Sequence, residues 1–171
     1  MNQEHAAHLV DPNSAELLNV LGPTVRFLAG PTGTDDSPCV MEGTIPPEGL
    51  VPLHSHADPE IFVLRAGEIE ALSLADGKSE WVRLTPGAIF HVPANAKHAW
   101  RNNTRVPAVA LIITTARIAR FFREIGEPLK ENEAPQPPSE EALAHFQKVS
   151  ARYGYWNASP EENEKFGIRL T

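Results

Sequence analysis

The sequence predicts an all-β domain, a sandwich or barrel of short strands, and two observations support this prediction. The chain contains 16 prolines and 11 glycines, many of which interrupt short apolar runs at intervals of about ten residues. In addition, Asp76-Gly77 lies between two segments in which apolar and polar residues alternate, 69–74 and 81–84. Asp-Gly in this setting predicts a β-hairpin, because both central positions of its tight turn need a positive φ.

Short segments between the prolines and glycines are the candidate strands, since they are rich in apolar and β-branched residues. They are 24–29, 39–45, 60–65, 69–74, 79–84, 88–92, 98–102 and 106–115.

The C-terminal part of the sequence predicts helices instead. Apolar residues recur at helical spacing over 116–125, and Gly126 is a typical helix stop. A polar, proline-rich connector follows over 127–138. Ser139 is then a suitable N-cap for a second helix, whose apolar stripe we expect to pack on the parent domain. From Asn157 onward the polar composition predicts a loose tail.

Length and composition limit the class of protein. The 171 residues fit one domain, which we divide into an N-terminal arm (1–20), a β domain (21–115) and a C-terminal extension (116–171). The net charge of −7, without clustered Lys or Arg, argues against nucleic-acid binding. The apolar runs are far shorter than the roughly 20 residues that cross a bilayer. With one cysteine and no signal-peptide pattern, we expect a cytoplasmic protein without a membrane partner.

The segment from His54 to Glu60 carries the strongest chemical signal. Side chains alternate between the two faces of a strand, so His54 and His56, which are two residues apart, point to the same side. Glu60 points to that side too if the strand continues. Two imidazoles and a carboxylate are good ligands for a divalent transition metal. The simpler alternative is that both histidines are exposed in a loop after Pro52.

Two separated motifs resemble those of the cupin superfamily. The first consists of Gly49, His54, His56, Glu60 and Gly67, with an initial gap one residue shorter than the family pattern. In the second, His98 precedes Asn102 by four residues, as the last histidine ligand of the family does.

The second motif departs from the family pattern at Pro86-Gly87-Ala88, where an Asp is common, and this affects a turn rather than a ligand. The resemblance covers residues 20–127, and the layout is similar to small bacterial cupins of the quercetin-dioxygenase-like type. It implies a jelly-roll β-barrel with a C-terminal helical extension and a metal ion held by His54, His56, Glu60 and His98.

Strand parity extends the expected site. If Glu60 and His98 point into the barrel, Phe62, Leu64 and Trp100 do so too and would wall a pocket beside the metal. The alternative, that these side chains are simply barrel core, is equally compatible with the sequence. The position of His91 is not fixed by parity, because a proline turn separates it from His98.

The expected ligand set suggests the chemistry. Three neutral histidines and one carboxylate around a divalent ion (Fe, Ni, Mn, Co, Cu or Zn) leave about one positive charge, which favours an anionic oxygen ligand. We therefore expect a metal-dependent dioxygenase that binds dioxygen beside a flavonol-like, enediol or diketone substrate, with Glu60 as a catalytic base. The alternatives are a non-oxidative isomerase, lyase or decarboxylase, and a non-catalytic small-molecule binding module. We also expect a homodimer, in which the N-terminal arm reaches across to the partner.

Overall fold

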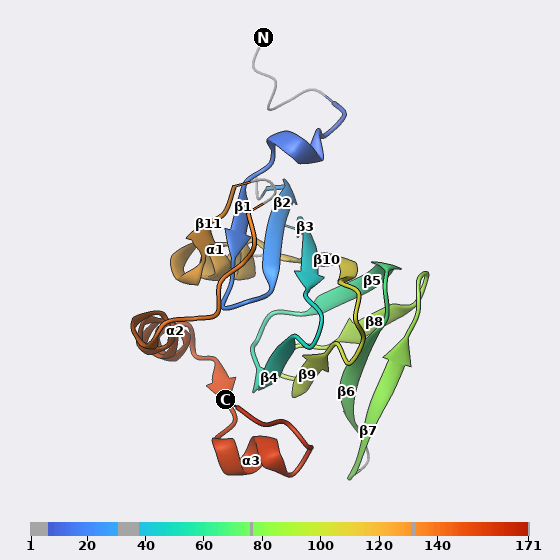
Figure 1. Ribbon diagram of the computed structural model, residues 1–171, viewed down its shortest axis with the longest axis vertical. Coiled ribbons are helices and arrows are strands. Elements are labelled where there is room, and N and C mark those ends of the chain that lie inside the picture. The colour runs from blue at the N-terminus through green and yellow to red at the C-terminus, as the bar shows by residue number, and fades with distance from the viewer. Residues whose placement is uncertain (1–6, 31–37, 76, 131–132, 171) are drawn as a thin grey trace.

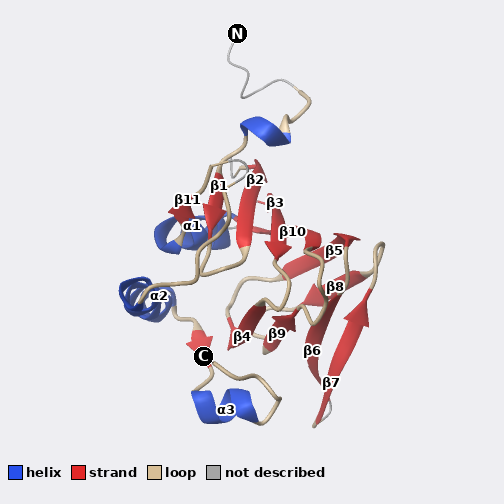
Figure 2. Ribbon diagram, in the orientation of Figure 1, coloured by secondary structure: helices blue, strands red, loops and turns tan. Residues whose placement is uncertain are grey.

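The computed structural model describes residues 7–30, 38–75, 77–130 and 133–170, and it consists mainly of two antiparallel sheets (Figure 1, Figure 2). Among these residues the larger sheet has the order β11 (Glu127–Pro128), β1 (Leu17–Asn19), β2 (Thr24–Ala29), β3 (Pro38–Ile45), β10 (Ala108–Thr115), β5 (Glu60–Ala66) and β8 (Ile89–Val92). The smaller sheet has the order β12 (Trp156–Asn157), β4 (Leu50–Ser55), β9 (His98–Arg101), β6 (Ile69–Ala75) and β7 (Lys78–Leu84). Helices α1 (Ala116–Ile125) and α2 (Glu140–Tyr153) lie beside the larger sheet, and α3 (Pro160–Glu164) lies apart from them. The predicted jelly-roll architecture is confirmed.

Each candidate strand of the sequence corresponds to an observed strand. The hairpin prediction is also confirmed, because β6 pairs with β7 and Ala75 lies opposite Lys78. Gly77 has a φ of 73°, as the turn requires, while Asp76 lies outside the described residues. The sequence did not predict β1, β4, β11 or β12 as separate strands, because they are short or, in β4, interrupted by Pro52.

The barrel interior is apolar and is shared by both sheets. Leu64 and Ala108 of the larger sheet pack with Ala71, Leu84 and Trp100 of the smaller one. A second cluster joins the larger sheet to α1 (Ala116–Ile125), and the fully buried side chains of Cys39 and Met41 lie in it. Because the inward side chains of facing strands interlock in this way, the position of each strand in the barrel is fixed by its apolar pattern.

The N-terminal segment contributes more to the fold than its polar composition predicts. Leu18 in β1 is 3% exposed and belongs to the core cluster under α1. The strand pairs with β2 on one side and with β11 on the other. Residues 17–19 are therefore part of the protein's own larger sheet, so this part of the expected arm does not reach toward a partner.

The two predicted helices are present with the expected caps. Gly126 ends α1, and its N–H donates to the carbonyl of Phe122. Ser139 caps α2 (Glu140–Tyr153) by accepting a hydrogen bond from the backbone N–H of Ala142. Val149 on α2 packs against Phe121 and Ile125 of α1, as expected for a stripe that covers the parent domain. In Figure 1 both helices lie beside the larger sheet, at the end away from β6 and β7.

The prediction of a loose tail is wrong. After α2 the chain forms β12 and α3 (Pro160–Glu164), and Ile168 is 2% exposed against Leu53, Leu72 and Ala99 on the outer face of the smaller sheet. The polar composition is misleading because Asn163 is fully buried and satisfied. Its amide donates to the carbonyls of Ala158 and Ser159, and its side-chain oxygen accepts from the N–H of Leu53.

We expect the tail to be a stabilising part of the fold. Replacing Ile168 by Ala should lower the free energy of unfolding by about 2–5 kcal/mol, since it leaves a cavity over the smaller sheet. Leu170→Ala is the matched control, because Leu170 is 47% exposed and its truncation should change stability by less than about 0.5 kcal/mol. Urea denaturation measures both, and equal effects of the two changes would show that the tail does not pack as described.

Candidate metal centre

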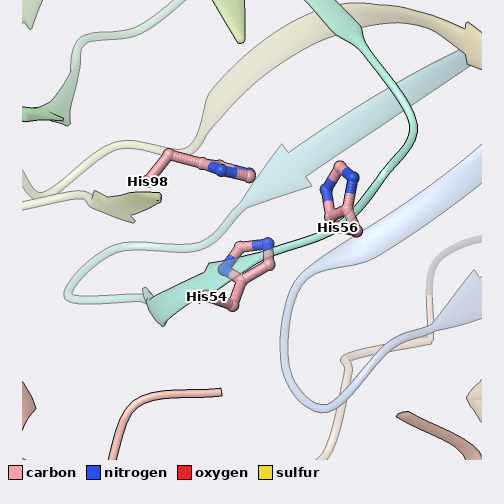
Figure 3. A group of neighbouring side chains, drawn as sticks. All are labelled: His54, His56 and His98. Atoms are coloured by element: carbon pink, nitrogen blue, oxygen red, sulfur yellow. The ribbon is translucent and has the colours of Figure 1, made fainter. Parts of the chain in front are cut away.

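Three histidines meet at one end of the barrel (Figure 3). His54 of β4 and His98 of β9 are direct partners in the smaller sheet, and their ring centroids are 4.2 Å apart. His56 follows the end of β4, and its ring centroid lies 5.2 Å from that of His98. One nitrogen from each ring lies within 4.8 Å of the other two. The exposed-loop alternative for these histidines is therefore wrong: His56 and His98 are buried and His54 is half-buried.

Each histidine ring is oriented by its own backbone. The Nδ1–H groups donate to the carbonyls of Pro52, Asp58 and Ala96, at 2.8, 2.9 and 2.9 Å respectively. A carbonyl oxygen can only accept, so Nδ1 carries a proton in all three rings, and Nε2 is the atom of each ring that is left to bind a metal. Hydrogen bonds of this kind are the usual way in which proteins orient metal-binding histidines.

Glu60 reaches the same point from the opposite sheet. It is the first residue of β5, it is 4% exposed, and its Oε2 lies 3.2 Å from Nε2 of His56 and 3.3 Å from Nε2 of His98. Nε2 of His98 is buried and makes no hydrogen bond among the described residues. A buried nitrogen lone pair without a donor is unfavourable by itself, and a metal ion would satisfy it.

The charges in the cluster follow from its burial. Burial opposes the ionisation of Glu60, but the neighbouring imidazoles of His56 and His98 outweigh it and hold the pKa of the carboxyl well below its usual range. Burial, together with the two neighbouring imidazoles, lowers the pKa of His54 to about 3, so that ring is neutral at neutral pH. At His56 burial is opposed by Glu60, and the pKa of the imidazole rises above 6.5.

This donor set fits a divalent transition metal. Three imidazole nitrogens and one ionised carboxylate converge from β4, β5 and β9, with the proton of each ring held on the side away from the cluster. Four protein ligands would leave room for a further ligand on a six-coordinate metal, whereas they would complete a tetrahedral zinc site.

Other residues of the two motifs shape the backbone around the cluster. Gly67 has a φ of 72°, and a Cβ there would lie 2.2 Å from the carbonyl oxygen of Pro107. Asn102 is fully buried, and its side-chain amide donates to the carbonyls of Ile45 and Val106. These residues hold the strand connections in place rather than contribute ligands.

The expected pocket residues lie together in the barrel. Phe62 and Trp100 have ring centroids 4.2 Å apart, and Trp100 is 4% exposed. With Leu64 they line an apolar cavity of about 40 Å³, and the lining contains none of the clustered histidines. His91 lies elsewhere: it is exposed on the edge strand β8, opposite Ile61.

Sequence reasoning missed a polar group that supports the centre. The backbone carbonyl of Asp58 accepts a hydrogen bond from the ring of His56. The buried carboxylate of Asp58 pairs with Arg117 at 2.5 Å and accepts a hydrogen bond from the hydroxyl group of Thr115 at 2.6 Å. Arg117 belongs to α1, so the helical extension is tied directly to the loop that carries a histidine. The only signal in the sequence was an Asp between His56 and Glu60.

Comparison with known proteins gives the class of this fold. Residues 41–114 match the family described as the cupin domain. The polyketide cyclase RemF from Streptomyces resistomycificus superposes with a TM-score of 0.55 and 16% identity, over 84% of this chain and 99% of that chain. The cupin domain of Drosophila melanogaster CENP-C superposes with a TM-score of 0.54 and 16% identity, over 65% of this chain and 83% of that chain. Residues 41–114 therefore match a cupin domain, and the superposed structures share its fold.

Two curated relatives are dioxygenases. The chain is 26% identical over 114 residues to quercetin 2,3-dioxygenase of Bacillus subtilis (strain 168), a match to 66% of this chain and 33% of that enzyme. It is 28% identical over 116 residues to acireductone dioxygenase of Bacillus cereus, a match to 63% of this chain and 68% of that enzyme. The chain therefore spans only one third of the first relative. Among the described residues, no helix is both long and apolar enough to cross a membrane.

We expect the four clustered residues to retain one metal ion per chain. Replacing His56 and His98 together by Ala removes two of the three converging nitrogens and should abolish metal retention after purification without chelators. His91→Ala is the matched control and should retain the metal of the unaltered protein, since that histidine lies exposed on β8. Elemental analysis measures the metal content. A double variant that still holds one ion per chain would rule out this site.

Proposed function

We propose that the protein is a metal-dependent dioxygenase acting on a small flavonol-like, enediol or diketone substrate, with His54, His56, Glu60 and His98 as the metal ligands. The observation that supports it most is the set of three histidine nitrogens that converge beside an ionised, buried carboxylate, with each Nδ1 turned to a backbone carbonyl. The resemblance to two dioxygenases of the same superfamily points to the same chemistry.

The protein's own residues have distinct tasks in this proposal. A bound divalent metal would polarise the oxygens of the substrate and, if redox-active, bring substrate and dioxygen together. Glu60 remains ionised in its buried position and can accept the proton of a substrate hydroxyl group. The neutral ring of His54 and the oriented rings of His56 and His98 hold their nitrogens in place without further rearrangement.

Oxygen consumption tests the proposal. Protein loaded with Fe(II) or Ni(II) should consume dioxygen in proportion to a flavonol or β-diketone added. Glu60→Gln preserves the size of the side chain but removes both the proton acceptor and the ionised metal ligand, so it should lower the rate by at least about 10²–10⁴-fold. His91→Ala should leave the rate unchanged, because that residue is exposed on β8.

The same assay distinguishes the two alternative functions. Turnover that persists without dioxygen, with Zn(II) or Mn(II) in the site, would indicate an isomerase, lyase or decarboxylase. Binding of the compounds without turnover of any of them would indicate a small-molecule binding module. Either outcome would refute the dioxygenase.

We further propose that Phe62, Leu64 and Trp100 form the apolar wall of the substrate pocket. The two aromatic rings present a surface suited to a planar ligand, and such contacts contribute about 0.5–1.5 kcal/mol beyond burial of area. Trp100→Ala should leave the metal content unchanged and weaken the binding of a flavonol by roughly tenfold, or about 1.4 kcal/mol. Titration of the folded variant measures this. A lowered melting temperature with unaltered affinity would make Trp100 a core residue only.

A homodimer is the assembly that we propose. Ile61, Ile89 and Ile113 are 38%, 69% and 37% exposed, and they lie on neighbouring strands of the larger sheet. A second copy that covers this face would remove three isoleucines from water. Sedimentation at micromolar concentration should give twice the chain mass of 18.7 kDa, and Ile89→Lys should shift the protein toward the monomer. A monomeric mass for the unaltered protein would refute the dimer.

A further inference from the structure

The C-terminal extension places one aromatic side chain against the metal centre. Tyr155 follows Gly154, whose φ of 72° turns the chain at the end of α2, and its backbone N–H donates to the carbonyl of Ser150 at 2.9 Å. The ring centroid of Tyr155 lies 5.1 Å from that of His56 and 4.4 Å from that of Phe121. The ring is thus held between α1 and a histidine of the metal centre.

The hydroxyl group of Tyr155 has no use within the fold. It is buried, and it makes no hydrogen bond among the described residues. Leaving a buried hydroxyl group unpaired costs about 1–3 kcal/mol, whereas phenylalanine would fill the same space without that cost. A hydroxyl group in this position is therefore explained best by a partner that is not part of the protein.

The hydroxyl group can act as a hydrogen-bond donor. A phenol ordinarily titrates at about pH 10, so its O–H bond is intact at neutral pH and can be donated to an oxygen atom.

A neighbouring tyrosine of the same segment provides the contrast. The hydroxyl group of Tyr153 donates to the carboxylate of Glu124 at 2.6 Å, and its ring packs on Phe121. Its polar atom is fully explained by a contact between the two helices. Tyr153 and Tyr155 are thus chemically equal side chains, two positions apart. Among the described residues, the hydroxyl group of Tyr153 has a hydrogen-bond partner and that of Tyr155 has none.

We propose that Tyr155 contacts the substrate, and that its hydroxyl group donates a hydrogen bond to an oxygen atom of the ligand bound at the metal centre. The ligand class is an anionic oxygen chelate, such as an enediolate or a phenolate. This inference rests on the proposed metal centre but not on the dioxygenase reaction, because any oxygen ligand of the metal could accept the bond. The extension after the barrel would then supply part of the substrate site.

The test compares Tyr155→Phe with Tyr153→Phe in the full chain loaded with Co(II). The probe is 4-nitrocatechol, a coloured enediol that chelates metal ions, titrated by its change in visible absorption. Tyr155→Phe should keep the metal content, weaken the binding of the probe by roughly tenfold (about 1.4 kcal/mol) and leave the melting temperature equal or raised. Tyr153→Phe should have the opposite pattern, a lowered melting temperature and unaltered binding of the probe.

The outcomes separate this inference from the proposed function. Wild-type affinity in Tyr155→Phe would overturn it and assign the hydroxyl group to a bound water molecule. Failure of the unaltered, metal-loaded protein to bind the probe would overturn it too, since a site open to an oxygen chelate must admit this small one. If the affinity falls as expected while no substrate supports oxygen consumption, the contact stands and the dioxygenase proposal fails.

Discussion

The candidate metal centre depends on three hydrogen bonds between histidine rings and the backbone. In each case Nδ1 donates to a carbonyl two residues away in the sequence, at Pro52, Asp58 and Ala96. The orientation of every ring is therefore set by the local path of its own strand or loop, and no side chain from elsewhere is needed. The rest of the fold must bring these backbone segments together, and the pairing of β4 with β9 does so for His54 and His98.

That backbone path is supported from outside the barrel. On the edge that faces away from β9, β4 pairs with β12. There the N–H of Ala158 donates to the carbonyl of Leu53, and the side chain of Asn163 accepts from the N–H of Leu53. The loop after β4 is tied to α1 through Asp58 and Arg117. Elements that carry none of the clustered histidines thus determine where these histidines lie.

The sequence was sufficient to predict the barrel strands, both longer helices and the residues that converge at the centre. The strands, the helices and the shared face of His54 and His56 depend on short-range patterns, which are alternation along a strand and helical spacing. The place of His98 beside them was expected only from the resemblance to the cupin motifs. The sequence was not sufficient for the tail, because a polar residue such as Asn163 looks exposed until its partners, more than a hundred residues away, are known. Tyr155 gave no signal for the same reason, since its neighbour His56 lies in a distant part of the chain.

The contact between the tail and β4 also has a consequence for the order of events during protein synthesis. When β4, β5 and β9 have left the ribosome, all four residues of the centre are available, yet the outer edge of β4 still has open hydrogen-bonding groups. Those groups find their partners only after residues 156–163 have been made. All four residues of the candidate centre are therefore synthesised before the segment that completes the outer edge of β4.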